Sequence, residues 1–207
     1  MIKVENEADC CTITLARPEK ANALTEEMLE SLALAATEAA TSAKVLILTG
    51  EGKVFSAGAD LDGMKNGLGL SPAWEDASGA IASFPGLSIA ALNGTLAGGA
   101  MGAALACDIR IAVHSANFFY PVMRLGYRPQ PSDPGRLAAL VGPSRAKMIL
   151  LAGQKIDAET ALSWGLIDRI CPAEALLDTA MSLAEHALAA DPGHGAALKR
   201  MTNEEEP

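Results

Sequence analysis

The chain of 207 residues contains few basic residues, cysteines, histidines and aromatic side chains. Its 16 Lys and Arg stand against 25 Asp and Glu, and the net charge of −9 argues against nucleic acid or a membrane surface as a partner. The four cysteines form no C-x-x-C pair, and no histidine lies at metal-ligand spacing from them. The sequence therefore predicts no metal site, and it indicates buried or reduced thiols.

Long hydrophobic runs are also missing. No segment reaches about eighteen apolar residues without a charge, which is the length that a membrane-spanning helix needs. The N-terminus, Met1 to Glu5, has no charged segment followed by an apolar one, so a cytoplasmic location is expected. The G-x-S-x-G and H-E-x-x-H motifs do not occur, and serine-hydrolase and zinc-protease chemistry therefore has no support.

The chain is rich in alanine, and apolar runs alternate along it with segments of helical periodicity. Residues 45–49 and 88–92 are continuous apolar segments, as expected for strands that are covered on both faces. A helix is predicted after Thr25, an N-cap residue followed by two glutamates, and another between Asp157 and Gly165. Alternating strands and helices predict an α/β fold with parallel pairing, and the length predicts one domain.

The most informative segments are two turns of small residues, Phe55–Leu61 and Asn93–Ala100. Each follows a β-prone run and precedes a predicted helix. Glycine and alanine let a ligand approach the backbone closely, and the first N–H groups of a helix have no partner inside it. Two such turns directed at one point would stabilise an oxyanion. The alternative is that both are tight turns in which glycine only permits close packing.

These residues give the chain a resemblance to the crotonase superfamily, which includes the enoyl-CoA hydratases and isomerases. The resemblance rests on residues 17–24, 55–61 and 93–112, and continues through 150–153 and 158–166. It implies a crotonase-like spiral of ββα units with C-terminal helices, as a single domain over residues 1–207. Relative to the family, the helical part at about 134–200 is expected to be shortened. A homotrimer or a dimer of trimers is the implied assembly.

The resemblance implies an acyl-CoA thioester as substrate, with coenzyme A as part of that substrate and no separate cofactor. The backbone N–H groups of Ala59 and Gly99 would form the oxyanion hole. The residues implied to bind the substrate are Lys20, Ala21, Leu24, Ala57, Asp60, Leu61 and Asp62. Coenzyme A is polyanionic and needs a local basic patch, for which the nearby candidates are Arg17, Lys20, Lys53 and Lys65.

The family's acidic side chains do not carry over. Hydratases have one glutamate at the position of Gly102 and another at that of Val122, and a third acidic position of some relatives is Gln130 here. Neither glycine nor valine can act as a general base. Isomerase or lyase (decarboxylase) chemistry through a thioester enolate is therefore favoured over hydration. The polar candidates for the pocket are Tyr120, Tyr127, Arg128, Gln130 and Asp133. The alternative is a catalytically silent paralogue that binds a CoA thioester or a protein.

Overall fold

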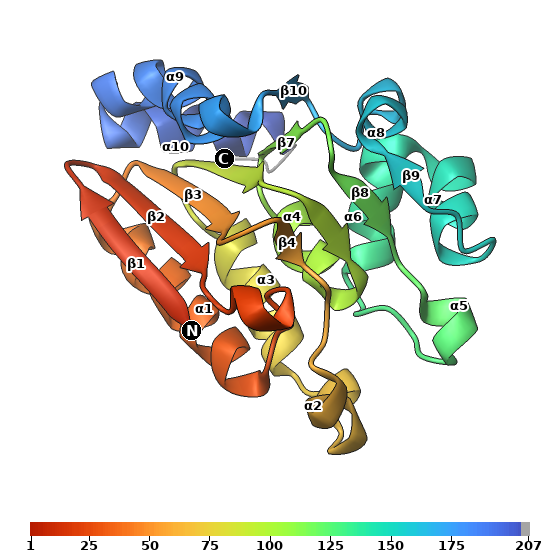
Figure 1. The fold of residues 1–207 in the computed structure, drawn as a ribbon. Coiled ribbons are helices and arrows are strands. Elements are labelled where there is room, and N and C mark those ends of the chain that lie inside the picture. Colours follow the sequence, from red (N-terminus) through yellow and green to blue (C-terminus); the bar gives the residue numbers. More distant parts are fainter. Residues whose placement is uncertain (204–207) are drawn as a thin grey trace.

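The computed structural model describes residues 1–203 and places the strands in two sheets (Figure 1). The larger sheet has the order β1-β2-β3-β5-β7-β10, and only the β1–β2 pair is antiparallel. Its strands are β1 (Ile2–Glu7), β2 (Cys10–Leu15), β3 (Val45–Gly50), β5 (Leu87–Leu92), β7 (Ile109–Val113) and β10 (Arg169–Cys171). The predicted α/β class with parallel pairing is confirmed.

The smaller sheet is made of short strands that follow those of the larger sheet. Its order is β4-β6-β8-β9, in which β4, β6 and β8 run parallel and β9 is antiparallel to β8. The strands are β4 (Val54–Ser56), β6 (Thr95–Ala97), β8 (Asn117–Phe119) and β9 (Ile156–Asp157). Residues 45–125 therefore repeat one pattern, a strand of the larger sheet, a strand of the smaller sheet and a helix, which is the ββα unit that the resemblance implies.

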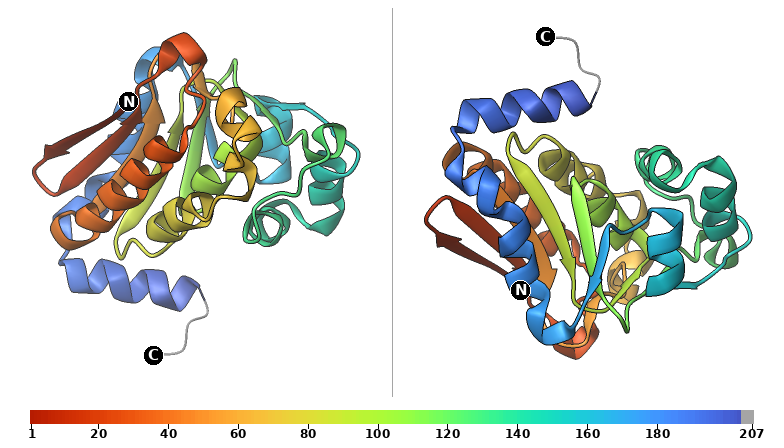
Figure 2. Two further views of the ribbon diagram at one scale, coloured as in Figure 1. Left: turned by 90° about the horizontal axis from the view of Figure 1, so that it is seen from below. Right: turned by 90° about the horizontal axis from the view of Figure 1, so that it is seen from above.

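The helices form layers on both sides of the larger sheet (Figure 2). Helices α1 (Glu26–Ser42), α3 (Ala73–Ala82) and α4 (Met101–Leu105) lie on one face, and α9 (Leu176–Ala189) lies on the other. Beyond β8, a lateral group of helices extends away from β1 and β2 (Figure 1). It consists of α5 (Val122–Leu125), α6 (Asp133–Val141), α7 (Pro143–Leu150) and α8 (Ala158–Trp164). The remaining helices are α2 (Leu61–Lys65) and α10 (Pro192–Thr202), with short 3-10 turns at Pro18–Lys20, Leu68–Leu70, Gly98–Ala100 and Ala173–Ala175.

Local sequence signals set several of these boundaries. The Thr25 hydroxyl accepts a hydrogen bond from the N–H of Met28 at 3.2 Å, and Asp157 caps α8 through the N–H of Thr160 at 2.8 Å. Gly165 ends α8 in the left-handed conformation. Strands β3 and β5 are buried along nearly their whole length, because α1 and α3 cover one face and α9 the other. Small alanines on α1 allow this helix to pack closely on its neighbours.

Two segments are more regular than the sequence suggests. Residues 62–79 contain several glycines and Pro72, a composition typical of loops, yet they hold most of the ten-residue helix α3. The proline-rich stretch 121–135 contains the four-residue α5. Helix α6 begins at Asp133 with Pro134 in its first turn, where a backbone N–H would have no partner inside the helix.

All four cysteines are free and buried, as expected. Between residues 1 and 203, no helix has the length and apolarity to cross a membrane. Residues 204–207 of the predicted domain lie outside the described part.

Candidate active site

The two small-residue turns lie against each other. Gly58 has a φ of +95° and Gly98 a φ of +58°, in the left-handed region that favours glycine. A Cβ added to Gly98 would lie 3.5 Å from the Cα of Gly58, and one added to Gly58 would lie 2.9 Å from the carbonyl oxygen of Ala97. The contact therefore needs glycine at 58, and two segments forty residues apart in the sequence form one site. This site lies at the carboxyl ends of the parallel strands, which is where open α/β sheets usually bind ligands.

Each glycine is followed by a backbone N–H group that has no acceptor in residues 1–203. The N–H of Ala59 and that of Gly99 make no hydrogen bond to the protein there, although the adjacent Gly58 and Asp60 both donate. Gly99 belongs to the 3-10 turn that leads into α4, and such first-turn donors point away from the helix. The two donors predicted from the sequence are therefore without an acceptor in residues 1–203, and both residues are partly buried.

The segment Lys20–Leu24 is attached directly to the first turn. Ala57 donates to the carbonyl oxygen of Ala21 at 2.9 Å, Leu24 to that of Gly58 at 2.7 Å, and Asp60 to that of Leu24 at 2.8 Å. The structure thus brings together the residues that were expected to bind substrate. Lys20, Ala57, Leu61 and Asp62 are exposed, Leu24 is buried, and Ala21 and Asp60 are partly buried.

Asn22 holds this junction together, and the sequence interpretation did not assign it a role. Its side chain is fully buried, accepts from the N–H of Arg17 at 2.8 Å, and donates to the carbonyl oxygens of Glu51 and Val54 at 2.9 and 2.8 Å. Asn22 has a φ of +52° and Ala21 one of +50°. Asparagine is enriched in the left-handed region, so the Ala-Asn pair was a usable signal.

Replacing Asn22 should destabilise the whole junction. In Asn22→Ala, the carbonyl oxygens of Glu51 and Val54 lose the Asn22 donor, and the N–H of Arg17 loses its acceptor. We expect the free energy of unfolding to fall by about 3 kcal/mol, measured by urea denaturation. Asn22→Gly is the matched control, because it loses the same bonds without the strain of a positive φ and should recover about 1 kcal/mol. A loss below about 0.5 kcal/mol for Asn22→Ala would contradict the assignment.

The predicted basic patch is only partly available. The Arg17 guanidinium contacts the Asp60 carboxylate at 2.7 Å and the carbonyl oxygen of Ala23 at 3.0 Å, so it serves the fold. This guanidinium is the main cause of the lowered pKa of Asp60, whose other oxygen caps α2. Lys65 pairs with Asp62 at 2.8 Å on the surface. Of the four candidates, Lys20 and Lys53 are exposed and form no ion pair in residues 1–203.

The five polar residues that were candidates for the pocket fall into two groups by burial. Tyr127 and Arg128 are exposed, and Gln130 is partly buried, with its amide 3.5 Å from the carbonyl oxygen of Gly69. Tyr120 and Asp133 are both buried, and the Tyr120 hydroxyl donates to Asp133 Oδ2 at 2.8 Å. Burial is the main cause that raises the pKa of both groups, that of Asp133 to about 6.

Gly99 has a packing role in addition to its free N–H. A Cβ at this position would lie 2.9 Å from the ring of Trp74, which is buried and donates from Nε1 to the carbonyl oxygen of Leu68 at 2.8 Å. The two interpretations of this glycine, ligand approach and close packing, are therefore not exclusive. A large side chain at 99 would disturb the fold as well as the site.

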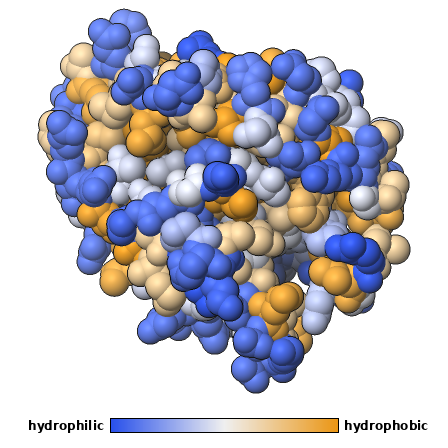
Figure 3. Space-filling view, viewed as in Figure 1, coloured by the Kyte–Doolittle hydropathy of each residue, from blue (hydrophilic) through white to orange (hydrophobic). Residues whose placement is uncertain are grey.

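Exposed apolar side chains lie on the segments around α2 and α5, and Figure 3 shows hydrophobic atoms over both elements among hydrophilic ones. The two segments also contact each other, because a Cβ on Gly69 would lie 3.7 Å from the ring of Tyr127. The apolar residues concerned, with exposed fractions from 47% to 92%, are Leu61, Leu70, Met123, Leu125 and Tyr127.

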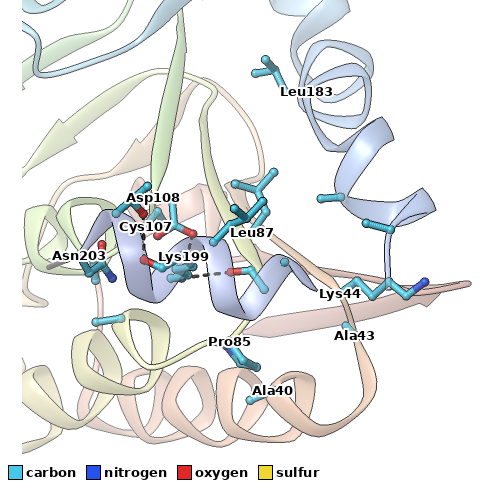
Figure 4. A pocket seen from close by; sticks show the side chains of 18 of the residues that line it. Ala40, Ala43, Lys44, Pro85, Leu87, Cys107, Asp108, Leu183, Lys199 and Asn203 are labelled. Atoms are coloured by element: carbon cyan, nitrogen blue, oxygen red, sulfur yellow. Dashed lines mark hydrogen bonds and ion pairs between the residues drawn. The ribbon is translucent and has the colours of Figure 1, made fainter. Parts of the chain in front are cut away.

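A pocket lies at the amino ends of the parallel strands of the larger sheet, opposite to the carboxyl ends where the two turns lie. It has a volume of about 1230 Å³, and its lining includes Lys44, Leu87 and Asp108, which precede or begin β3, β5 and β7. Helix α10 lies across it (Figure 4), and Lys199 Nζ reaches Asp108 Oδ2 at 2.8 Å and the carbonyl oxygens of Phe84 and Gly86. Neither Ala59 nor Gly99 lines this pocket, so it is separate from the candidate site.

The comparison with known families gives one match over nearly the whole chain. Residues 5–206 match the model described as enoyl-CoA hydratase/isomerase. The chain belongs to the enoyl-CoA hydratase/isomerase family. The family assignment based on the two turns is therefore confirmed, and acyl-CoA thioesters are the substrates of this family.

Individual relatives in the family carry different activities in their names. The chain is 36% identical over 198 residues to the 1,2-epoxyphenylacetyl-CoA isomerase of Escherichia coli K12, covering 90% of this chain and 75% of that protein. It is 34% identical over 171 residues to "Probable enoyl-CoA hydratase echA6" of Mycobacterium tuberculosis, covering 82% of this chain and 70% of that protein. Family membership therefore does not decide between isomerisation and hydration.

Solved structures confirm the fold. An enoyl-CoA hydratase subunit from Geobacillus kaustophilus HTA426 superimposes with a TM-score of 0.90 at 30% identity, covering all of this chain and 83% of that one. The architecture is the crotonase fold, with the ββα units described above.

Proposed function

We propose that this chain binds an acyl-CoA thioester and stabilises its enolate between the backbone N–H groups of Ala59 and Gly99. The observation that supports the proposal is the contact of the two turns at Gly58 and Gly98, each of which is followed by a backbone N–H without an acceptor in residues 1–203. Backbone donors that are already oriented stabilise a developing oxyanion without reorganisation, and each is worth about 3–4 kcal/mol in the transition state. Coenzyme A enters as part of the substrate, and no separate cofactor is proposed.

The reaction that we propose is isomerisation or lyase chemistry and not hydration. Hydration needs one group to activate water and another to protonate the carbon next to the thioester. The two hydratase positions are Gly102 and Val122, both buried, and neither residue has a titratable group. Reactions that pass through the enolate alone, such as moving a double bond or losing a carboxylate, need less acid–base assistance. A homotrimer or a dimer of trimers is the proposed assembly.

Acyl-CoA binding is the direct test, and Ala57 offers a site-specific variant. Ala57 is exposed and lies in the junction between Lys20–Leu24 and the first turn. Ala57→Glu adds a negative charge beside the path of a polyanionic ligand, so the Kd for acetyl-CoA should rise at least about tenfold, or 1.4 kcal/mol, in calorimetry.

The matched control is Leu34→Glu on α1, where the side chain is 60% exposed and far along the sequence from both turns. It makes the same change in net charge and should leave the Kd unchanged. Equal effects of the two variants would contradict binding at this junction. The absence of heat at about 1 mM acetyl-CoA or a longer acyl-CoA with the unaltered chain would remove the proposal altogether, catalytic and silent versions alike.

A further inference from the structure

A carboxyl group from a different helix occupies the place of a side chain at position 102. Gly102 lies in α4, three residues after Gly99, and therefore about one helical turn from the free N–H. A Cβ on Gly102 would lie 2.6 Å from Asp133 Oδ1, which comes from the start of α6. The missing side chain at 102 is thus what allows the Asp133 carboxyl to reach the wall beside the second turn.

The carboxyl is oriented, and one of its oxygens is unused. Asp133 is 1% exposed, its Oδ2 accepts from the Tyr120 hydroxyl at 2.8 Å, and its Oδ1 has no hydrogen-bond partner in residues 1–203. A buried acceptor without a partner lowers stability and is rare in native proteins. Oδ1 faces Gly102 of α4, so the free oxygen is the one directed toward the candidate site.

Burial brings the pKa of the Asp133 carboxyl closer to neutral pH, and the neighbouring charged groups modify this effect. Burial raises its pKa to about 6, and Glu75 on α3 adds to the increase. Tyr120 and Arg136, the latter on α6 itself, act in the opposite direction, and α4 contributes no charged group. A carboxyl that titrates near neutral pH can both accept and return a proton, which is what general acid–base catalysis requires.

We propose that Asp133 is the catalytic proton-transfer residue of this site, in place of the acid missing at position 102. The inference rests on the proposed function, because the thioester must be held by Ala59 and Gly99. Asp133 Oδ1 takes a proton from the carbon next to the thioester carbonyl. The C–H bond breaks, an O–H bond forms, and the electron pair moves to the thioester oxygen as an enolate. In a β,γ-unsaturated thioester the protonated carboxyl then gives a proton to the γ-carbon, and no other reactant is consumed.

The test is deuterium exchange at C2 of 3-hexenoyl-CoA in D2O, followed by NMR. Asp133→Asn keeps the size of the side chain and an acceptor for Tyr120, but it cannot take a proton. The exchange rate should fall at least about a hundredfold, which is the usual lower range for a lost general base, while the Kd from calorimetry stays within about threefold. Exchange that is unchanged in Asp133→Asn overturns the proposal. Binding without exchange in the unaltered chain also overturns it, but leaves acyl-CoA binding standing, and absent binding removes the proposed function first.

The pH profile separates a catalytic Asp133 from a structural one. Exchange in the unaltered chain should rise with pH to a plateau above about 6, where the carboxylate form dominates. In Tyr120→Phe the hydrogen bond that lowers the pKa of Asp133 is lost, so the midpoint should move to higher pH. A Tyr120 with only a structural role would lower the melting temperature and leave the midpoint in place, and that result counts against the proposal.

An exchange of positions gives a second, independent variant. Gly102→Glu alone should lower the melting temperature, because its Cβ meets Asp133 Oδ1 at 2.6 Å. The double variant Gly102→Glu/Asp133→Gly removes the clash and moves the acid to α4. We expect it to recover the melting temperature and at least about a tenth of the unaltered exchange rate. If the double variant recovers its melting temperature but exchanges C2 no faster than Asp133→Gly, a carboxyl at this wall of the site is not catalytic.

Discussion

Replacing Gly99 by proline should lower the rate of enolate formation about 100- to 1000-fold relative to Gly99→Ala, the range found when one oxyanion donor is lost. Both substitutions place a Cβ against the Trp74 ring, at 2.9 Å in the unaltered backbone, but only proline removes the N–H. Proline is tolerated in the first turn of a helix, where the N–H has no internal partner. The alanine variant is thus the matched control for packing.

The measurement is C2 deuterium exchange of a bound acyl-CoA, normalised to the folded fraction from thermal melts. Gly99→Ala should melt a few degrees below the unaltered chain, since overpacking costs typically about 1–3 kcal/mol, and should retain most of the exchange rate. Equal exchange rates of the alanine and proline variants would mean that the Gly99 N–H does not contact the thioester oxygen. Gly99→Val is a poorer test, because its larger side chain would press on the Trp74 ring. Unfolding and loss of ligand binding would then occur together and could not be separated.

Crotonyl-CoA should be hydrated at least about a thousandfold more slowly than the median enzyme turnover of ~10 per second. The Asp133 carboxyl lies against Gly102 in α4, and Gly102 and Val122 supply no second group to activate water. The measurement is the loss of absorbance of crotonyl-CoA at high protein concentration. The control is C2 deuterium exchange of 3-hexenoyl-CoA by the same protein preparation, which shows that the site is active.

A gain of function would support the same explanation. Adding Val122→Glu to Gly102→Glu/Asp133→Gly places carboxylates at both positions where hydratases have them, and hydration should rise above the level of the unaltered chain. A turnover within about tenfold of the median for the unaltered chain would contradict the assignment of these two positions.

Much of the fold and part of the site were predictable because the responsible residues act locally. Thr25 and Asp157 cap their helices through hydrogen bonds to residues three positions away, and strands β3 and β5 are mostly apolar because both faces are covered. The short strands of the smaller sheet were missed, since two or three residues carry no periodicity. The prediction of a basic patch was only partly right, because Arg17 forms an ion pair with Asp60, a residue 43 positions away in the sequence.

The sequence by itself determined the family, the parallel α/β order and the two turns whose backbone donors are candidates for the site. Each depends on residue types whose effect is local: glycines that adopt a positive φ, capping side chains and apolar runs. Only the tertiary structure decided which groups share a place. It brought Gly58 against Gly98, closed the junction through Asn22, and set Asp133 against Gly102 across 31 positions of sequence. A buried carboxyl beside a glycine is a property of helix packing, because the two residues lie on different helices and no spacing along the chain encodes their distance.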